Sequence, residues 1–144
     1  MTLHFGFSDS QQLYRDQVRR FARNELAPNR QKWDVERRRP ETMVKKALEA
    51  GLLDSDMTHL MRGIMIEEVG YVDFNCALPF LVTTEPFELN RLDGVPDEIR
   101  NPVRQAVREG NTIIAVGFTE PDSGTDVANF RSTAVLEGDE WVIN

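Results

Sequence analysis

The apolar pattern of the chain changes near residue 111, and this change limits the fold more than any other feature. Up to Gly110, apolar residues recur every three or four positions, which is typical of amphipathic helices. The run Thr112–Thr119 is instead rich in β-branched residues and favours a strand. We therefore expect an all-α domain over residues 1–110 and the start of a β-domain, itself incomplete, over residues 111–144.

Several segments of the first part have the spacing of helices. Their approximate ranges are 9–26, 40–50, 57–69, 74–84 and 102–109. Ser8 and Gln11 stand at the spacing of a capping box just before the first segment. Glycine suits the residue after a helix, so Gly51, Gly70 and Gly110 are expected to end three of these helices.

Other residues indicate where these helices begin. Pro40 and Pro102 suit the first helical position, and Asn101 suits the cap before it. Residues 54–56 offer capping side chains for the third helix. The segment from Phe74 to Thr84 lacks a clean period but is long enough to be a buried helix.

The end of the chain has the pattern of a hairpin. Arg131–Leu136 and Trp141–Ile143 read as strands, and Glu137–Glu140 between them carries the Gly-Asp pair of a tight turn. With the run after Gly110, this predicts that the chain ends in a β-domain.

Composition excludes some classes of function. A net charge of -7 and a pI near 4.9 argue against binding to duplex nucleic acid, which needs a basic surface. Cys76 is the only cysteine, so neither an intrachain disulfide nor a cysteine metal cluster is possible, and it suits a small core position. His4 and His59 stand alone, so no metal site is expected. The N-terminus lacks the pattern of a signal peptide, which favours a cytoplasmic location.

The stretch Thr119–Asp126 is the candidate functional motif of the chain. Pro121 stiffens the exit from the expected strand, Gly124 permits a positive φ or a close backbone approach, and Thr125 adds a hydroxyl beside backbone N–H groups. Together they can form a cradle of donors for an anion such as a pyrophosphate. Any polar turn between strands uses the same residue types, so the residues alone leave both interpretations open.

The order of motifs resembles the acyl-CoA dehydrogenase family. The pattern T-E-P-x-x-G-[ST]-D at residues 119–126 is followed by a basic-Ser pair at Arg131-Ser132 and by G-D-x-[WY]-V-[IL]-N at residues 138–144. Weaker motifs of that family lie upstream at Leu26-Ala27-Pro28, Lys45–Leu53 and Ile66–Gly70. The resemblance implies a mainly α fold with a β segment, namely an N-terminal helical domain followed by the first strands of a β-barrel domain.

The resemblance also assigns roles to residues of this chain. It implies that Thr119 donates toward the flavin ring, that Thr125 meets the FAD pyrophosphate and the acyl-CoA substrate, and that Val82 lines the acyl pocket. The residues implied in cofactor binding are Val116, Phe118, Thr119, Gly124 and Thr125, and those implied in substrate binding are Thr125 and Val82. Glu120 is expected to shape the loop. The catalytic base is expected beyond Asn144.

The implied activity is the FAD-dependent oxidation of an acyl-CoA thioester to a trans-2-enoyl-CoA, as in fatty acid metabolism. A carboxylate removes the α proton while a hydride passes to the flavin. Electron-transfer flavoprotein is the expected acceptor, and a homodimer or homotetramer is the expected assembly.

The chain departs from the family pattern at two places, and two alternative functions remain open. The family usually has serine where this chain has Thr125, and a longer loop where Leu53 runs directly into Asp54. An acyl-CoA oxidase or a nitroalkane-oxidase-like flavoenzyme would share the same loop and pass electrons to oxygen. A non-catalytic helical partner protein would keep the fold without the active site.

Overall fold

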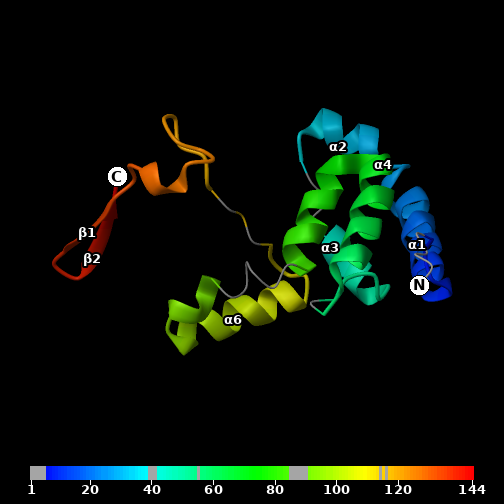
Figure 1. Ribbon diagram of the computed structural model, residues 1–144, viewed down its shortest axis with the longest axis horizontal. Coiled ribbons are helices and arrows are strands. Elements are labelled where there is room, and N and C mark those ends of the chain that lie inside the picture. Colours follow the sequence, from blue (N-terminus) through cyan, green and yellow to red (C-terminus); the bar gives the residue numbers. More distant parts are fainter. Residues whose placement is uncertain (1–5, 39–41, 55, 85–90, 114, 116) are drawn as a thin grey trace, which may run out of the picture. The chain divides into compact units, whose positions relative to one another are not determined.

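The computed structural model describes residues 6–38, 42–54, 56–84, 91–113, 115 and 117–144. The chain divides into two compact units, Met1–Ile114 and Ala115–Asn144, which are described separately. The first is helical and the second contains a two-stranded sheet (Figure 1). The expected fold class, mainly α with a β segment, is confirmed. The assignment of domains to residues 1–110 and 111–144 stays a prediction.

The helical unit contains more elements than the sequence pattern indicates. In chain order they are α1 (Asp9–Phe21), η1 (Ala22–Leu26), α2 (Arg30–Glu36), α3 (Met43–Glu49), α4 (His59–Thr84), η2 (Arg91–Gly94) and α6 (Asp97–Arg108). The expected capping box is present, because Ser8 Oγ accepts the N–H of Gln11 and Gln11 Oε1 accepts the N–H of Ser8. The π-helix η1 extends α1 to Leu26.

Helix α2 was not expected. None of its residues is buried, so it has no apolar face that a periodic pattern could reveal. It ends at Arg37, which has a left-handed conformation with φ of 50°.

Helix α3 ends as predicted at Gly51. This residue has φ of +68°, its N–H donates to Leu48 O at 2.9 Å, and the N–H of Leu52 donates to Ala47 O at 2.9 Å. These two bonds form a Schellman motif, which a left-handed glycine favours. Pro40, the expected first residue of this helix, lies outside the described residues.

Helix α4 corrects two expectations. Its N-terminal cap is Thr58, whose Oγ1 accepts the N–H of Met61 at 3.3 Å, rather than a residue of 54–56. Gly70 does not end the helix. A Cβ at Gly70 would lie 3.4 Å from Phe74 Cδ2, which is an ordinary contact, so this position does not require glycine.

The break in α4 falls at Asp73. Its φ of −153° and ψ of 104° are not helical, and its Oδ1 accepts the N–H of Asn75 at 3.0 Å. Asp73 therefore caps a second segment that runs to Thr84, because aspartate can accept from the free N–H groups of a helix start. The predicted helix from Phe74 to Thr84 is confirmed as this segment.

Helix α6 begins earlier than predicted. It starts at Asp97, after Pro96, so Pro102 lies inside the helix and not at its first position. Asp97 and Glu98 place acidic side chains in the first turn, where the helix dipole favours them. The end at Gly110 is confirmed, with φ of +69°.

The core of this unit forms where α1 and η1 pack against α4, with α3 beside them (Figure 1). Its most deeply buried large side chains are Phe80, Leu26, Ile64, Met65, Val18, Val69 and Val107. Tyr14 closes one side of the core by donating its hydroxyl to Leu52 O at 2.8 Å, and burial raises the pKa of this phenol. Cys76 is 2% exposed, which confirms it as a small core residue.

A buried ion pair joins α1 to α4. Glu68, whose side chain is 7% exposed, accepts from Arg15 Nε at 2.6 Å and from both Nε and Nη2 of Arg19 at 2.9 and 2.7 Å. The hydrogen bonds from Arg19, opposed by burial and helped by Arg15, lower the pKa of Glu68 from 4.5 to about 2. The carboxylate is therefore held in its charged form.

The second unit ends in the predicted hairpin. Strands β1 (Ala134–Glu137) and β2 (Glu140–Ile143) are antiparallel, and the ladder continues with a pair of hydrogen bonds between Thr133 and Asn144. Gly138 takes the first position of the two-residue turn with φ of +66°, a conformation that glycine adopts without strain. A short 3-10 helix, η3 (Val127–Asn129), precedes the hairpin.

The expected strand over Thr112–Thr119 was wrong for the residues that the structure describes. Those at 112, 113, 115 and 117–119 are in no strand. A β-branched run becomes a strand only where another strand satisfies its backbone groups. The described part of the chain pairs no strand with this run.

Replacing Glu68 by glutamine tests the ion pair between α1 and α4. At pH 7 we expect E68Q to lower the free energy of unfolding by about 2 kcal/mol, because both arginines lose a charged acceptor. A carboxyl with a lowered pKa stabilises the fold above its unfolded pKa and loses that effect as the pH falls toward about 2. The difference between E68Q and the unsubstituted chain in urea titrations should therefore shrink from pH 5 to pH 3.

Glu67 provides the control, because its side chain is 60% exposed and, among the described residues, accepts only from Arg15. We expect E67Q to change stability by less than about 1 kcal/mol. Equal effects of the two substitutions would contradict the role given to Glu68.

A matched pair of glycines tests how α6 lies against α3. A Cβ at Gly110 would lie 2.8 Å from Lys45 Cα and 2.9 Å from Leu48 Cδ1, whereas a Cβ at Gly51 would meet nothing within 4 Å. Both have a positive φ. In urea unfolding we expect Gly110→Ala to cost about 2–4 kcal/mol and Gly51→Ala about 1 kcal/mol, since only the first adds a steric clash. Equal costs would show that Gly110 does not lie close to Lys45 and Leu48 of α3.

Candidate functional site

The stretch Thr119–Asp126 forms a tight turn in the second unit. The N–H of Glu120 donates to Ser123 O at 2.8 Å, and the N–H of Ser123 donates to Glu120 O at 3.3 Å. Ser123 is 7% exposed, and its Oγ donates to Asp126 O at 2.5 Å. The turn therefore holds its own shape through bonds among neighbouring residues.

Consecutive backbone N–H groups follow this turn without an acceptor. Within the described part of the chain, the N–H groups of Gly124, Thr125 and Asp126 donate to no acceptor, and the hydroxyls of Thr119 and Thr125 have no partner. Gly124, Thr125 and Thr119 are all exposed. A run of unpaired N–H groups beside a hydroxyl can bind an anion.

Gly124 was expected either to have a positive φ or to permit a close backbone approach. It does not have a positive φ. A Cβ at this position would lie 3.6 Å from Thr119 Cγ2, which is an ordinary contact. The structure thus brings Gly124 beside Thr119, and the backbone at Gly124 stays open on its exposed side.

The carboxylates of this loop are all engaged. Glu120 Oε2 accepts the N–H of Arg131 at 2.6 Å and Oε1 accepts that of Ser132 at 3.1 Å. Asp122 pairs with the Arg131 guanidinium at 2.7 Å, and Asp126 Oδ2 accepts from Asn129 Nδ2 at 2.5 Å. The expectation that Glu120 shapes the loop is confirmed by its two bonds. Among the described residues, the N–H groups at 124–126 therefore have no acceptor, whereas each carboxylate of the loop is bound to a donor.

The other predicted cofactor residues lie just before this turn. The ring of Phe118 is 44% exposed and meets the ring of Phe130 edge-on, with centroids 6.2 Å apart. Val116 lies outside the described residues. The structure therefore brings together Phe118, Thr119, Gly124 and Thr125 within one loop, while their roles stay predictions.

Val82, the predicted substrate residue of the first unit, lies on α4. It is partly buried and stands at helical spacing from Phe74 and Leu78, which are 60% and 51% exposed. These residues form an apolar stripe on the second segment of α4. The role of Val82 stays a prediction.

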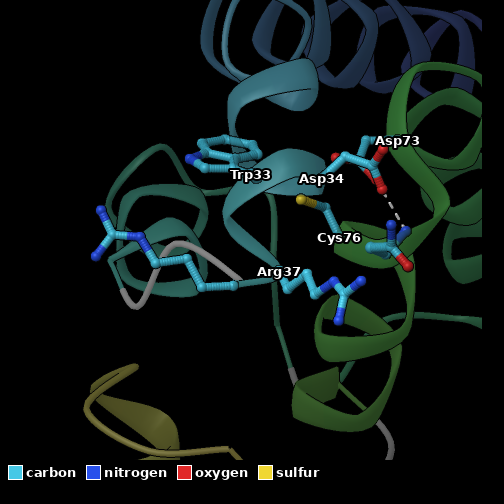
Figure 2. Close-up of a pocket in the computed structure, with 7 residues that line it drawn as sticks. Trp33, Asp34, Arg37, Asp73 and Cys76 are labelled. Atoms are coloured by element: carbon cyan, nitrogen blue, oxygen red, sulfur yellow. Dashed lines mark hydrogen bonds between the residues drawn. The ribbon is translucent and has the colours of Figure 1, made fainter.

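A pocket of about 330 Å³ lies between α2 and the break in α4 (Figure 2). Its lining residues are Trp33, Asp34, Arg37, Arg38, Asp73, Asn75 and Cys76. Figure 2 shows Asp34 and Asp73 close to Cys76, with Arg37 on the opposite side of the thiol. No sequence pattern indicated this pocket, because it depends on the unexpected helix α2 and on the break at Asp73.

The pocket has mixed charge, with carboxylates and guanidinium groups on its walls. Among the described residues, no group of three His, Cys, Asp or Glu side chains is placed to hold a metal ion. No helix in the described ranges is both long enough and apolar enough to span a bilayer.

The titration of Glu120 tests the loop geometry. The backbone bond from Arg131, followed by bonds from Ser132, lowers the pKa of this carboxyl. The carboxylate should therefore stay charged, and keep its bonds, to a pH below its ordinary pKa of 4.5. NMR of the carboxyl carbon during an acid titration measures the midpoint. A midpoint at or above 4.5 would contradict the two bonds.

Comparisons with known proteins agree with the motifs. The family described as acyl-CoA dehydrogenase, N-terminal domain, matches residues 8–89, which is more than half of the chain. The short-chain specific acyl-CoA dehydrogenase of Clostridium acetobutylicum is 29% identical over 151 residues, a match that covers 99% of this chain and 40% of that protein.

Solved structures share the fold. A chain from the structure of the electron transferring flavoprotein of Acidaminococcus fermentans has a TM-score of 0.73 at 25% identity, covering 99% of this chain and 40% of its own length. A glutaryl-CoA dehydrogenase from Mycobacterium smegmatis in complex with FADH2 has a TM-score of 0.77 at 21% identity, covering 96% and 38%. The chain spans about 40% of the length of the relatives that it matches. It belongs to the acyl-CoA dehydrogenase family.

Proposed function

We propose that this chain provides the flavin-binding loop of a FAD-dependent oxidoreductase that converts an acyl-CoA to a trans-2-enoyl-CoA. Membership of the acyl-CoA dehydrogenase family supports the reaction type. The complex of the M. smegmatis relative with FADH2 supports FAD as the cofactor.

The observation that carries this proposal is the run of N–H groups at Gly124, Thr125 and Asp126, which donate to no acceptor among the residues that the structure describes. A pyrophosphate needs several donors that converge from one side, and backbone N–H groups provide them without a positive side chain. The exposed hydroxyl of Thr125 adds a further donor. The residues present therefore suit the pyrophosphate of FAD.

Other residues receive roles around this contact. In the proposal, Val116 and Phe118 line the flavin ring and the Thr119 hydroxyl donates toward its pyrimidine side. A hydrogen bond there favours the electron-rich reduced form of the ring. Bound FAD supplies the acceptor for the substrate hydride. No residue of this chain is assigned as the base that removes the α proton.

Substrate and partners belong to the same proposal. Thr125 would contact the thioester arm, and Val82 would line the acyl pocket from the apolar stripe on α4. Electron-transfer flavoprotein is the proposed acceptor, with support from the structural likeness to the A. fermentans chain. A homodimer or homotetramer in the cytoplasm stays a prediction.

Thr125 offers a direct test through FAD binding. Quenching of flavin fluorescence on titration of FAD with the purified chain measures the affinity. We expect Thr125→Val to weaken binding about fivefold to tenfold, because the substitution removes a hydroxyl donor and keeps the shape. Thr125→Ser keeps the hydroxyl and should bind within about twofold of the unsubstituted chain.

The titrations test FAD binding and the role of Thr125 separately. Failure of the unsubstituted chain to bind FAD would contradict the proposed function. Equal affinities of the valine and serine variants would leave FAD binding in place and remove Thr125 from the site.

A further inference from the structure

We propose that the pocket between α2 and the break in α4 binds a small linear zwitterion, a molecule with a carboxylate at one end and a primary ammonium group at the other. The pocket lies wholly within the helical unit, so this ligand site is independent of the proposed flavin loop. The class of ligand follows from the charges on the pocket walls and from where they lie.

Two of the lining side chains belong to the packed interior of the helical unit. Cys76 is 2% exposed, and Trp33 is partly buried and packs against the apolar core. Packing therefore holds these parts of the wall in place. The volume of about 330 Å³ is at the lower end of the range for small-molecule sites, so a ligand of a few heavy atoms suits the pocket.

Charges of both signs line the pocket without pairing with each other. Among the described residues, the side chains of Asp34 and Arg37 form no hydrogen bond or ion pair, and Asp73 accepts only the N–H of Asn75, at 3.0 Å. Figure 2 shows Asp34 and Asp73 close to Cys76, and Arg37 on the opposite side of the thiol. The pocket therefore offers two carboxylates at one side and a guanidinium at the other.

Simpler ligands do not match this arrangement. An anion would meet the carboxylates of Asp34 and Asp73, and a cation would meet the guanidinium of Arg37, in each case at a cost from like charges. An apolar molecule would displace water from all three groups and pair with none of them. A zwitterion pairs with both signs at once.

The ligand is linear because the two signs lie on opposite sides of the pocket. An α-amino acid carries both of its charges next to one carbon, whereas an ω-amino acid carries them at the two ends of a methylene chain. The indole of Trp33 offers an apolar face to such a chain, and it also attracts an ammonium group.

The backbone at Arg37 supports a task for its side chain. The N–H of Arg37 donates to Asp34 O and that of Arg38 donates to Trp33 O, each at 3.2 Å, which forms a Schellman motif at the end of α2. Glycine suits this left-handed position best, because a Cβ makes a φ of 50° unfavourable. The chain has an arginine there, and such backbone outliers are frequent at ligand sites.

Heteronuclear NMR of the 144-residue chain tests the site. The probes are β-alanine, γ-aminobutyrate and δ-aminovalerate, which differ in chain length, and butanoate and butylamine, which each carry one charge. The reporters are the indole N–H of Trp33 and the side-chain amide of Asn75, and Trp141 in the second unit is the internal reference.

We expect at least one ω-amino acid to shift both reporters saturably, with a dissociation constant of about 1 mM or lower, and to leave the indole of Trp141 unshifted. Butanoate and butylamine should bind at least about tenfold more weakly than that ω-amino acid, because each pairs with one side of the pocket and meets a like charge at the other.

Variants separate the charges from the fold. R37Q and D34N should each weaken binding at least about tenfold, whereas R20Q, at an exposed arginine of α1 outside the pocket, should stay within about twofold of the unsubstituted chain. R37G should also weaken binding at least about tenfold and yet unfold at a higher urea concentration, because glycine adopts the left-handed conformation without strain.

Each result decides for or against the proposal. No saturable shift of the reporters by any ω-amino acid at about 10 mM would overturn it. Binding of butanoate or butylamine as tightly as the best ω-amino acid would replace the zwitterion site by an anion or a cation site. A loss in R20Q as large as in R37Q would assign the effect to net charge. Unchanged binding by R37G, or a lower urea midpoint, would overturn the role given to Arg37.

Discussion

The carboxylate of Glu68 is the contact on which the helical unit depends, because it fixes how α1 lies along α4. The two helices bury apolar side chains such as Val18 and Val69, and each of these is next in sequence to a member of the ion pair. An apolar interface alone is tolerant of small shifts, since burial has no direction. Hydrogen bonds from Arg15 and Arg19 at 2.6–2.9 Å do have direction, so they select one register for that interface.

Sequence rules predicted the parts of the fold that are decided within a few residues. The capping box at Ser8, the glycine ends of α3 and α6, and the hairpin turn at Gly138 each depend on local backbone geometry. Gly70 lies inside α4, which runs on to the break at Asp73. The strand expected over Thr112–Thr119 was wrong because a strand depends on a distant partner, and the described part of the chain pairs no strand with this run. Helix α2 has no buried face, so no pattern indicated it.

The candidate site also has features that the local sequence predicted and features that depend on tertiary packing. The motif Thr119–Asp126 predicted a loop with donors for an anion, and the N–H groups at 124–126 have no acceptor in the described part of the chain. Gly124 does not have the positive φ that was one of its two expected roles, and the other, a close backbone approach, stays a prediction. The pocket beside Cys76 could not be predicted, because Trp33 and Asp73 meet there only through tertiary packing.

A chain with a net charge of -7 can still offer an anion site, because the local arrangement of dipoles decides the potential there. Exposed charges more than about 8 Å away are largely screened at physiological salt, so most of the acidic surface has little effect on this loop. The nearby carboxylates of Glu120, Asp122 and Asp126 are each bound to a donor within the loop. The bonds from Arg131 and Ser132 to Glu120, and the pairs of Asp122 and Asp126 with donors of the loop, therefore partly offset the acidic side chains nearest to Gly124 and Thr125.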